Sequence, residues 1–392
     1  MTDILAISTY VTLRNADHAG GKVNYWYMQK LGADHTLTFI SKFSKAERAS
    51  DWRTRTLNGE YRIINAHDYR PTFFKKCMNK IIHIMRISYY VFFFDWYTQC
   101  YYRAEIKRLK KEGYRPETVI LDWTQCVFLS KTVRKVFPKA RIIAVEQDVT
   151  FLSYERRIVL AQTQKQRKIA RKHYEIIKKH ELHFLSYADQ INVLNCKDAD
   201  LLITNAVPPS KIKVISPYYD DYSTVTRKPN STEIVFYGAM SRKENYECCI
   251  WFIKNVLNRL PSCFTFTIIG SHPHESLQAY VSDRVRVTGF IADVTPYFES
   301  ALCSVVPLLL GAGIKIKVLE SMSAGIPVLT NAIGIEGIPA KAGSEYLHCE
   351  SAEDYVAAIE RLAADKSLQA ELCQNARIFV RQAFDYKRDS YI

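Results

Sequence analysis

The chain has 392 residues, of which 48% are hydrophobic and 24% charged, with 14 Gly and 13 Pro. This composition is typical of a folded protein of about two domains, and it excludes a disordered, collagen-like or small stapled chain. Its formal charge of +14 is unevenly spread, because residues 1–217 carry a net +17 and residues 218–392 a net −3. The basic excess therefore belongs to the first half.

The ten cysteines form no CxxC pair and no cluster with histidine at metal-ligand spacing. Most lie in apolar runs, so we expect reduced thiols in a cytoplasmic protein. The N-terminus lacks the features of a signal peptide. The most apolar stretch, residues 81–97, is interrupted by ionisable side chains and is shorter than the ~20 residues of a spanning helix.

Short apolar runs alternate with helical patterns, which is typical of β-α-β units and parallel sheets. In the first half we expect a helix at Gly21–Leu31 and strands at Ile4–Ser8, Thr36–Ile40, Thr118–Leu121 and Arg141–Val145. In the second half we expect strands at Glu233–Tyr237, Phe264–Ile269, Val285–Thr288, Cys303–Pro307 and Pro327–Thr330. The pattern breaks in residues 213–230, which predicts one Rossmann-like domain at 1–215 and another at 216–375.

Residues 307–330 read as a strand, a glycine loop, a short helix ended by Gly325 and a further strand. Gly311 and Gly313 allow the backbone to approach a ligand closely, and the helix start offers N–H groups to an anion. Lys315 and Lys317 add two cations, so the pattern suits a diphosphate. A tight turn with solvated lysines is the alternative, because glycine loops are weak signals on their own.

Residues 307–338 resemble the donor-binding signature of GT-B glycosyltransferases, particularly glycosyltransferase family 4. Further pieces follow in the expected order, and together they cover 233–338: Ile234–Met240 with Asn245, Thr267–Gly270, Val287–Phe290 and Val294–Tyr297. The resemblance implies an α/β GT-B fold, in which two Rossmann-like domains face a cleft and the C-terminal one holds a nucleotide sugar. It also implies a helix at 376–392 that crosses back to the first domain.

The resemblance implies that Glu320 corresponds to the second Glu of the family's Glu-x7-Glu motif, which binds the ribose of the nucleotide. The first Glu is replaced by Ala312, which leaves the donor sugar and the retaining stereochemistry open. The resemblance further implies that amides of Gly311, Gly313 and Ile314 approach the donor. Lys317 is the first candidate to bind the diphosphate and neutralise it as it leaves, and Lys315 is the second.

A second departure follows Gly238, where many relatives carry an Arg directly and a Lys six positions later. Those positions are Ala239 and Glu244. Arg242 and Lys243 lie in the same loop and are candidates to stabilise the leaving diphosphate instead. Solvated side chains without a role are the alternative.

In the first half, His18, Gly20 and Gly21 resemble the glycine-rich turn of GT-B enzymes on the acceptor side. Glu146 and Asp148 follow a predicted strand, whose carboxyl end faces the crevice in α/β proteins. In an inverting enzyme either carboxylate would be the general base, and in a retaining enzyme it would bind substrate. A solvated strand end is again the alternative.

Residues 73–115 mix cations with large apolar side chains, a pattern that suits an anionic membrane surface, where a lipid-linked acceptor would be met. The alternative is aromatic core with solvated cations. Nucleic acid is the rival partner for a basic surface. No nucleic-acid module is recognisable, so we do not expect this partner.

Taken together, the residues and the resemblance predict a cytoplasmic glycosyltransferase (EC 2.4, hexosyltransferase type), peripheral at the inner face of the cell membrane. It would move a sugar from a nucleotide-diphosphate donor to a glycan or lipid-linked saccharide, with retention expected, in polysaccharide or glycolipid biosynthesis. No metal or cofactor is expected, because helix dipoles and cations can neutralise the leaving group. Three alternatives stay open: an inverting enzyme with Asp148 or Glu146 as base, a sugar-nucleotide epimerase, and a non-catalytic membrane-peripheral binding protein.

Overall fold

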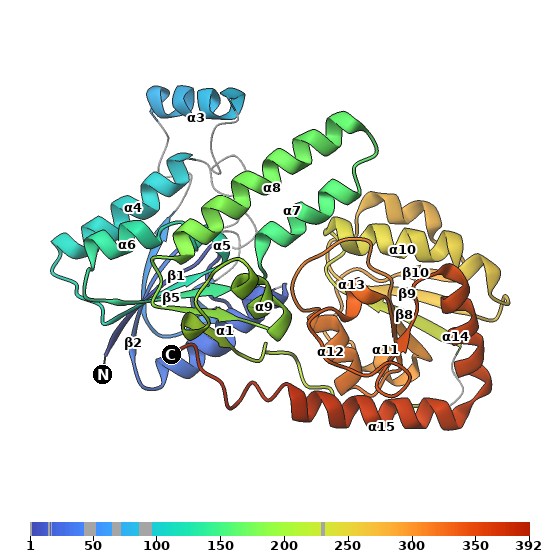
Figure 1. The fold of residues 1–392 in the computed structure, drawn as a ribbon. Helices are drawn as coiled ribbons and strands as arrows, with labels where there is room; N and C mark the ends of the chain where they lie inside the picture. The colour runs from blue at the N-terminus through green and yellow to red at the C-terminus, as the bar shows by residue number, and fades with distance from the viewer. Residues whose placement is uncertain are drawn as a thin grey trace. The chain divides into compact units, whose positions relative to one another are not determined.

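The computed structural model describes residues 2–14, 16, 18–42, 52–64, 72–85, 96–228 and 232–392. The chain divides into two compact units, each built on its own parallel sheet with helices packed around it (Figure 1). Unit 1 contains Met1–Ile215 and Asp389–Ile392, and unit 2 contains Ser216–Arg388. The sequence analysis placed its domain boundary at the same peptide, between residues 215 and 216.

Unit 1 has a seven-stranded sheet in the order β3-β2-β1-β4-β5-β6-β7, and every pair is parallel. The strands are β1 Asp3–Ile7, β2 Thr36–Lys42, β3 Glu60–Ile64, β4 Thr118–Asp122, β5 Arg141–Glu146, β6 Gln190–Val193 and β7 Ile212–Val214. The central strands are continuous apolar runs because helices cover both faces of a parallel sheet. All of β4 is buried for this reason.

The helices of unit 1 lie between the strands along the chain, one or two after most strands. They are α1 Ala19–Gly32, α3 Phe73–Met85, α4 Trp96–Lys111, α5 Thr124–Val127, α6 Ser130–Val136, α7 Thr150–Val159, α8 Gln164–Leu185 and α9 Cys196–Thr204, with 3-10 turns at Trp52–Arg55 and Pro209–Lys211. The predicted basic, aromatic stretch 73–115 is thus divided between α3 and α4, and its residues 86–95 lie outside the described residues. None of the helices in the described ranges combines the length and apolar character that a membrane crossing requires.

Unit 2 has a six-stranded parallel sheet in the order β10-β9-β8-β11-β12-β13. Its strands are β8 Glu233–Tyr237, β9 Thr265–Ile269, β10 Val285–Val287, β11 Cys303–Val306, β12 Val328–Thr330 and β13 Leu347–His348. Its helices are α10 Lys243–Asn255, α11 Thr295–Ser300, α12 Ile316–Ser323, α13 Ala332–Ile335, α14 Ala352–Ala364 and α15 Lys366–Ala383, with 3-10 turns at Leu257–Arg259 and Glu275–Tyr280.

The end of the chain differs from the predicted helix at 376–392. Helix α15 begins ten residues earlier, because the Asp365 side chain caps it by accepting a hydrogen bond from the Leu368 amide. The helix lies within unit 2, where Arg377 donates to the carbonyls of Val225 and Ala324. Only the last four residues join unit 1, and there Tyr391 stacks on Tyr27 at 4.4 Å between ring centroids.

Candidate active site

The order of strands in unit 2 creates a switch point between β8 and β11. The chain leaves β8 toward β9 on one side and later returns to β11 on the other side. Ligands of open α/β sheets bind at such a point, outside the carboxyl ends of the strands. Here the two loops that leave these strands are the Gly238 loop and the Gly311–Gly313 loop, which contain most of the predicted donor-binding residues.

Lys317 joins the first of these loops to α12. Its Nζ donates a 2.6 Å hydrogen bond to Oδ1 of Asn245 and lies 4.3 Å from the centroid of the Phe236 ring. A side chain on Gly238 would bring its Cβ to 2.9 Å from this ammonium, and the φ of +157° also disfavours one. Glycine at 238 therefore keeps the lysine accessible to the loop. Burial of the ammonium lowers the pKa of Lys317 to about 8.

Lys315 is differently placed from Lys317. Its buried Nζ donates to the carbonyl of Gly313 at 2.5 Å and lies 3.7 Å from a carboxylate oxygen of Glu336. Gly313 adopts a φ of +68° and Gly311 one of +145°, both in the region that favours glycine. Lys315 thus closes the glycine loop from within, and its ammonium is already engaged by protein groups.

Glu320 is buried on α12, with its Oε1 3.5 Å from the amide nitrogen of Asp220. One turn later, Ser323 Oγ accepts a hydrogen bond from the Tyr222 amide at 3.1 Å. The predicted ribose-binding carboxylate therefore lies against the backbone of residues 220–222, which had no role in the sequence analysis.

Arg242 and Lys243 are exposed at the start of α10. Arg242 forms an ion pair with Glu244, and Lys243 lies 3.5 Å from Glu247. The acidic residues of α10 thus balance both cations. Of the predicted cations, Lys317 is the one that the structure brings against Gly238.

Unit 1 has its own switch point, between β1 and β4. His18 begins α1 after β1, and its Nδ1 accepts a 3.0 Å hydrogen bond from the Gly21 amide. Gly21 has no room for a side chain, because its Cβ would lie 2.6 Å from that of Ala16. A Cβ on Gly20 would lie 3.1 Å from the indole of Trp123, which follows β4. The predicted acceptor-side turn is therefore closely packed around small residues.

Trp123 and Tyr10 are candidate site residues that the sequence analysis missed. With His18 they form an aromatic cluster, in which Tyr10 lies 4.7 Å from His18 and 5.4 Å from Trp123 between ring centroids. Tyr10 remains 38% exposed. Trp123 has φ +68° and ψ 146°, a conformation that costs a non-glycine residue of the order of 1–3 kcal/mol and is concentrated at functional sites. Its position directly after β4 was the available sequence signal, but no residue pattern reveals its backbone conformation.

Glu146 and Asp148 end up in different environments. Glu146 is fully buried, accepts a hydrogen bond from Thr124 Oγ1, and has no partner for its Oε1 among the described residues. Burial raises the pKa of Glu146 to about 8. Asp148 is half-buried and accepts a 3.2 Å hydrogen bond from Thr150 Oγ1. Of the two candidate bases, Asp148 is thus the one with exposed surface for a substrate.

A third acid, Asp122, is the last residue of β4 and directly precedes Trp123. It accepts hydrogen bonds from the Trp123 amide at 3.0 Å, from Gln147 Nε2 at 2.8 Å and from Asn24. Burial outweighs these bonds and raises the pKa of Asp122 to about 7. The carboxyl ends of β4 and β5 thus hold two buried carboxyl groups, those of Asp122 and Glu146.

Metal-binding patterns give no candidate site. An Asp-x-Asp spacing occurs at Asp198 and Asp200, but both lie on α9, where residues two apart point to different sides. Asp198 is buried 2.6 Å from Lys197, while Asp200 is exposed. Within the described ranges, no three His, Cys, Asp or Glu side chains are grouped to hold a metal ion.

Comparisons with known proteins agree with this architecture. Residues 231–365 match the family model "Glycosyl transferases group 1". A curated relative, an uncharacterized 44.6 kDa protein in the cps region of Klebsiella pneumoniae, is 22% identical over 194 residues. That match spans 46% of this chain and about half of the relative, 48%.

Solved structures match almost the whole chain. Sucrose-phosphate synthase from Thermosynechococcus elongatus has a TM-score of 0.66 at 14% identity, and HepE from Anabaena, solved with UDP-glucose, has 0.67 at 10%. Each match covers 99% of this chain and 96% of the other. The lipopolysaccharide outer core galactosyltransferase WaaB has 0.61 at 15%, covering 98% and 96%. These matches establish the predicted GT-B fold.

The fold and the family model together indicate the class of protein that this chain resembles. The chain has the GT-B fold of the solved glycosyltransferases that it matches. More particularly, residues 231–365, which contain the switch point of unit 2, are similar to the group 1 glycosyltransferases.

Proposed function

We propose that this protein transfers a sugar from a nucleotide-diphosphate donor, held by unit 2, to a hydroxyl of a glycan or lipid-linked saccharide. The observation that carries the proposal is the meeting of Gly238 with Lys317 at the β8–β11 switch point, beside the Gly311–Gly313 loop. A diphosphate is bound by a cation and by accessible backbone amides, which Lys317 and the glycine loop before α12 can supply. HepE, which shares the fold, has been solved with UDP and with UDP-glucose, which supports this class of donor.

The family resemblance supplies the proposed roles of the donor-side residues, and their positions are compatible with these roles. Lys317 interacts with the diphosphate and stabilises its charge as it leaves, and the amides of the Gly311–Gly313 loop bind its oxygens. Lys315 keeps that loop closed through Gly313 and Glu336. Glu320 accepts hydrogen bonds from the ribose hydroxyls. With these groups neutralising the leaving group, the reaction as proposed needs no metal ion.

For the stereochemical course we propose retention, as the family resemblance implies, with inversion as the alternative. Asp148 is the candidate that favours the alternative, because it is half-buried and follows the carboxyl end of β5. Glu146 suits that role less well, because it is fully buried and its pKa is raised to about 8. The anomeric configuration of the product distinguishes the two courses.

We place the acceptor on unit 1, beside His18, Gly20 and Gly21. The similarity to a protein of a cps region supports a role in polysaccharide biosynthesis. A lipid-linked acceptor would be met at the cytoplasmic face of a membrane, to which the basic unit 1 is suited by its charge.

The proposal is tested first with nucleotide sugars. The whole protein is screened for an increase in Tm with UDP-, GDP-, dTDP- and ADP-sugars, and the best one is assayed for hydrolysis and transfer. A Glu320→Ala variant should lose about 10- to 100-fold in kcat/KM for the donor, as is typical when one binding group at a reacting centre is removed. Glu320→Gln, which keeps the shape of this buried side chain, checks that a loss does not reflect misfolding.

The matched control is Glu360→Ala, an exposed carboxylate on α14. It should leave kcat/KM unchanged. Wild-type kinetics in Glu320→Ala would overturn the ribose role, and the absence of stabilisation or turnover with every nucleotide sugar would overturn the proposed function. Conversion of the donor without an acceptor would instead indicate an epimerase, and absence of binding in calorimetry a non-catalytic protein.

A further inference from the structure

Helices α7 and α8 form a strongly basic hairpin in unit 1. They pack side by side and are joined by a short turn (Figure 1). Residues 150–185 hold nine Lys and Arg but three Asp and Glu. A net +6 in 36 residues is a large share of the +14 of the whole chain. Seven of these cations are exposed: Arg157, Lys165, Arg167, Lys168, Arg171, Lys172 and Lys179.

Four exposed lysines share one side of α8. Its buried residues Ile177, Phe184 and Leu185 face the core of unit 1. At 3.6 residues per turn, Lys165, Lys168, Lys172 and Lys179 lie on the opposite side, with Glu175 as the one acid among them. Arg167 and Arg171 are exposed nearer the direction of Leu185, in the first turns of the helix. Five of these cations, Lys165, Arg167, Lys168, Arg171 and Lys172, form no ion pair with any described residue. This side of α8 is therefore a positive surface that the protein itself does not neutralise.

Apolar side chains are exposed at the tip of the same hairpin. Val159, the last residue of α7, is 81% exposed, and Leu160 in the turn is 43% exposed. Beside them the two helices enclose a groove of about 340 Å³, lined by Leu160, Ile169, Ala170, His173 and Arg157 among others. The guanidinium of Arg157 lies 4.4 Å from the ring centroid of Tyr154 at its wall. The tip thus combines aliphatic surface with cations.

We propose that the α7–α8 hairpin docks this protein on an anionic phospholipid surface, with the cations of α8 on the headgroups and the Val159–Leu160 tip inserted between them. This inference rests on the proposed function for its purpose, since a lipid-linked acceptor is presented at such a surface. The argument for membrane binding itself depends only on charge complementarity and on the exposed apolar side chains.

The composition of the surface favours lipid over nucleic acid. Proteins that bind single strands pair cations with aromatic rings on which bases stack. The exposed apolar residues of this tip are aliphatic, and the rings of Tyr154 and Tyr174 are engaged by Arg157 and Lys178 respectively. Aliphatic side chains beside lysine and arginine instead match the boundary between headgroups and acyl chains.

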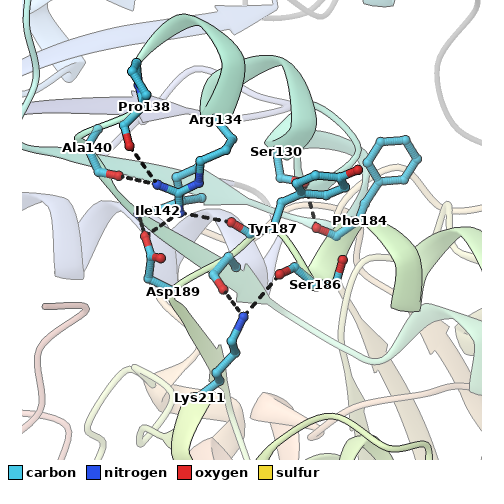
Figure 2. A network of polar contacts seen from close by, with 11 residues as sticks. Ser130, Arg134, Pro138, Ala140, Ile142, Phe184, Ser186, Tyr187, Asp189 and Lys211 are labelled. Atoms are coloured by element: carbon cyan, nitrogen blue, oxygen red, sulfur yellow. Dashed lines mark hydrogen bonds and ion pairs between the residues drawn. The ribbon is translucent and has the colours of Figure 1, made fainter.

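The base of the hairpin is firmly attached to the sheet. Figure 2 shows Arg134 donating to the carbonyls of Ala140 and Tyr187 and to the carboxylate of Asp189, at 3.0, 3.1 and 2.6 Å. Ser130 Oγ donates to the carbonyl of Phe184 in the last turn of α8 at 2.6 Å. The hairpin is therefore fixed to unit 1 at its base, as a docking element requires.

The test is co-sedimentation of the full-length protein with vesicles of phosphatidylcholine alone and with 30 mol% phosphatidylglycerol. Since each cation near such a surface contributes to binding, K165Q/K168Q/K172Q should lower the partition coefficient on the anionic vesicles at least tenfold. Val159→Ser should lower it as well. Both changes are at exposed positions, so the fold should be retained. Vesicles without phosphatidylglycerol should bind the wild-type protein weakly.

The control K341Q/R361Q/R381Q removes the same charge from exposed positions of unit 2 and should bind like the wild type. The inference is overturned if this control loses as much binding as the hairpin variant, or if Lys76→Gln with Lys80→Gln on α3 abolishes binding while the hairpin variant does not. Tight binding of RNA without binding of vesicles overturns it too. Donor hydrolysis, measured without vesicles, separates this inference from the proposed function. Unchanged hydrolysis and lost vesicle binding in the hairpin variant support both proposals. Vesicle binding by a wild-type protein that hydrolyses no donor supports the docking role and contradicts the proposed enzymatic function.

Discussion

Lys315 and Lys317 are two residues apart, yet they serve different loops. Lys315 at the start of α12 turns back to Gly313 and Glu336, whereas Lys317 extends to Asn245 and Gly238. Lys315 precedes α12 with an extended backbone, φ −99° and ψ 93°, whereas Lys317 lies in the first turn of the helix, which explains the divergence. An ammonium whose pKa is lowered to about 8 loses its charge near physiological pH, and this gives Lys317 a measurable signature.

We expect kcat/KM for the donor to fall as the pH rises through about 8, because the free enzyme then loses the Lys317 charge that attracts the diphosphate. A Lys317→Arg variant should keep its charge and abolish this fall, although its affinity can differ. Lys317→Met should lose roughly 10- to 1,000-fold in kcat/KM at pH 7. The measurement is a pH profile of initial rates between pH 6 and 9.5.

The Lys315→Met variant serves as the comparison, since its ammonium is engaged within the loop. It should retain the alkaline fall of the wild type even if its activity is reduced. An unchanged pH profile in Lys317→Arg would show that another group titrates, and Lys317 would lose its assigned role.

At the scale of elements, the base of α8 depends on a few polar side chains. Arg134 joins the end of α6, the start of β5 and the turn after α8 through its bonds to Ala140, Tyr187 and Asp189. Although burial alone would raise it, the hydrogen bonds from Arg134 and from the Ile142 amide lower the pKa of Asp189. This attachment positions a helix whose outer face we assign to lipid.

Arg134→Ala should lower the free energy of unfolding of unit 1 by about 1–3 kcal/mol, since it leaves carbonyls and a carboxylate without their donor. Urea unfolding followed by circular dichroism measures the loss. Arg141→Ala, which removes one hydrogen bond to Gln190 at an exposed site, should cost less than about 1 kcal/mol. Equal losses in the two variants would show that the Arg134 network adds nothing beyond an ordinary surface contact.

At the scale of the whole molecule, the protein consists of two units with separate sheets and separate cores. The chain passes between them after Ile215 and again after Arg388. The last residues contribute to unit 1, where the carbonyl of Tyr391 accepts hydrogen bonds from Gln190 and Asn192. Two cores of this kind can unfold independently.

Calorimetry should therefore show two thermal transitions, and a nucleoside diphosphate should raise the Tm of one of them. Ligand at 100 times its Kd stabilises the unit that holds it by about 2.7 kcal/mol. UDP is the probe to use first. A Lys317→Met variant should show the two transitions without this shift, and an equal shift of both transitions in the wild type would contradict a site confined to unit 2.

Much of the fold was predictable because it depends on local pattern. The predicted strands of both units are present within one or two residues of their expected ends, since continuous apolar runs bounded by turn residues report buried parallel strands directly. The strands that were not predicted include β3, whose exposed Glu60 and half-buried Arg62 interrupt its apolar character, β7, which has three residues, and β13, which has two. The loop at 311–313 was also predictable from its glycines, because few other residues adopt a positive φ.

The sequence by itself determined the class of fold, the location of the glycosyltransferase-like segment in the second half and the residue types of the candidate donor site. Only the tertiary structure decided which of these residues meet. Gly238 and Lys317 come together because β8 and β11 are neighbours, and strand order depends on packing of the whole sheet. In the same way, the burial that separates Glu146 from Asp148, the strained backbone of Trp123 and the outward side of α8 arise from long-range contacts, which no local pattern in the chain records.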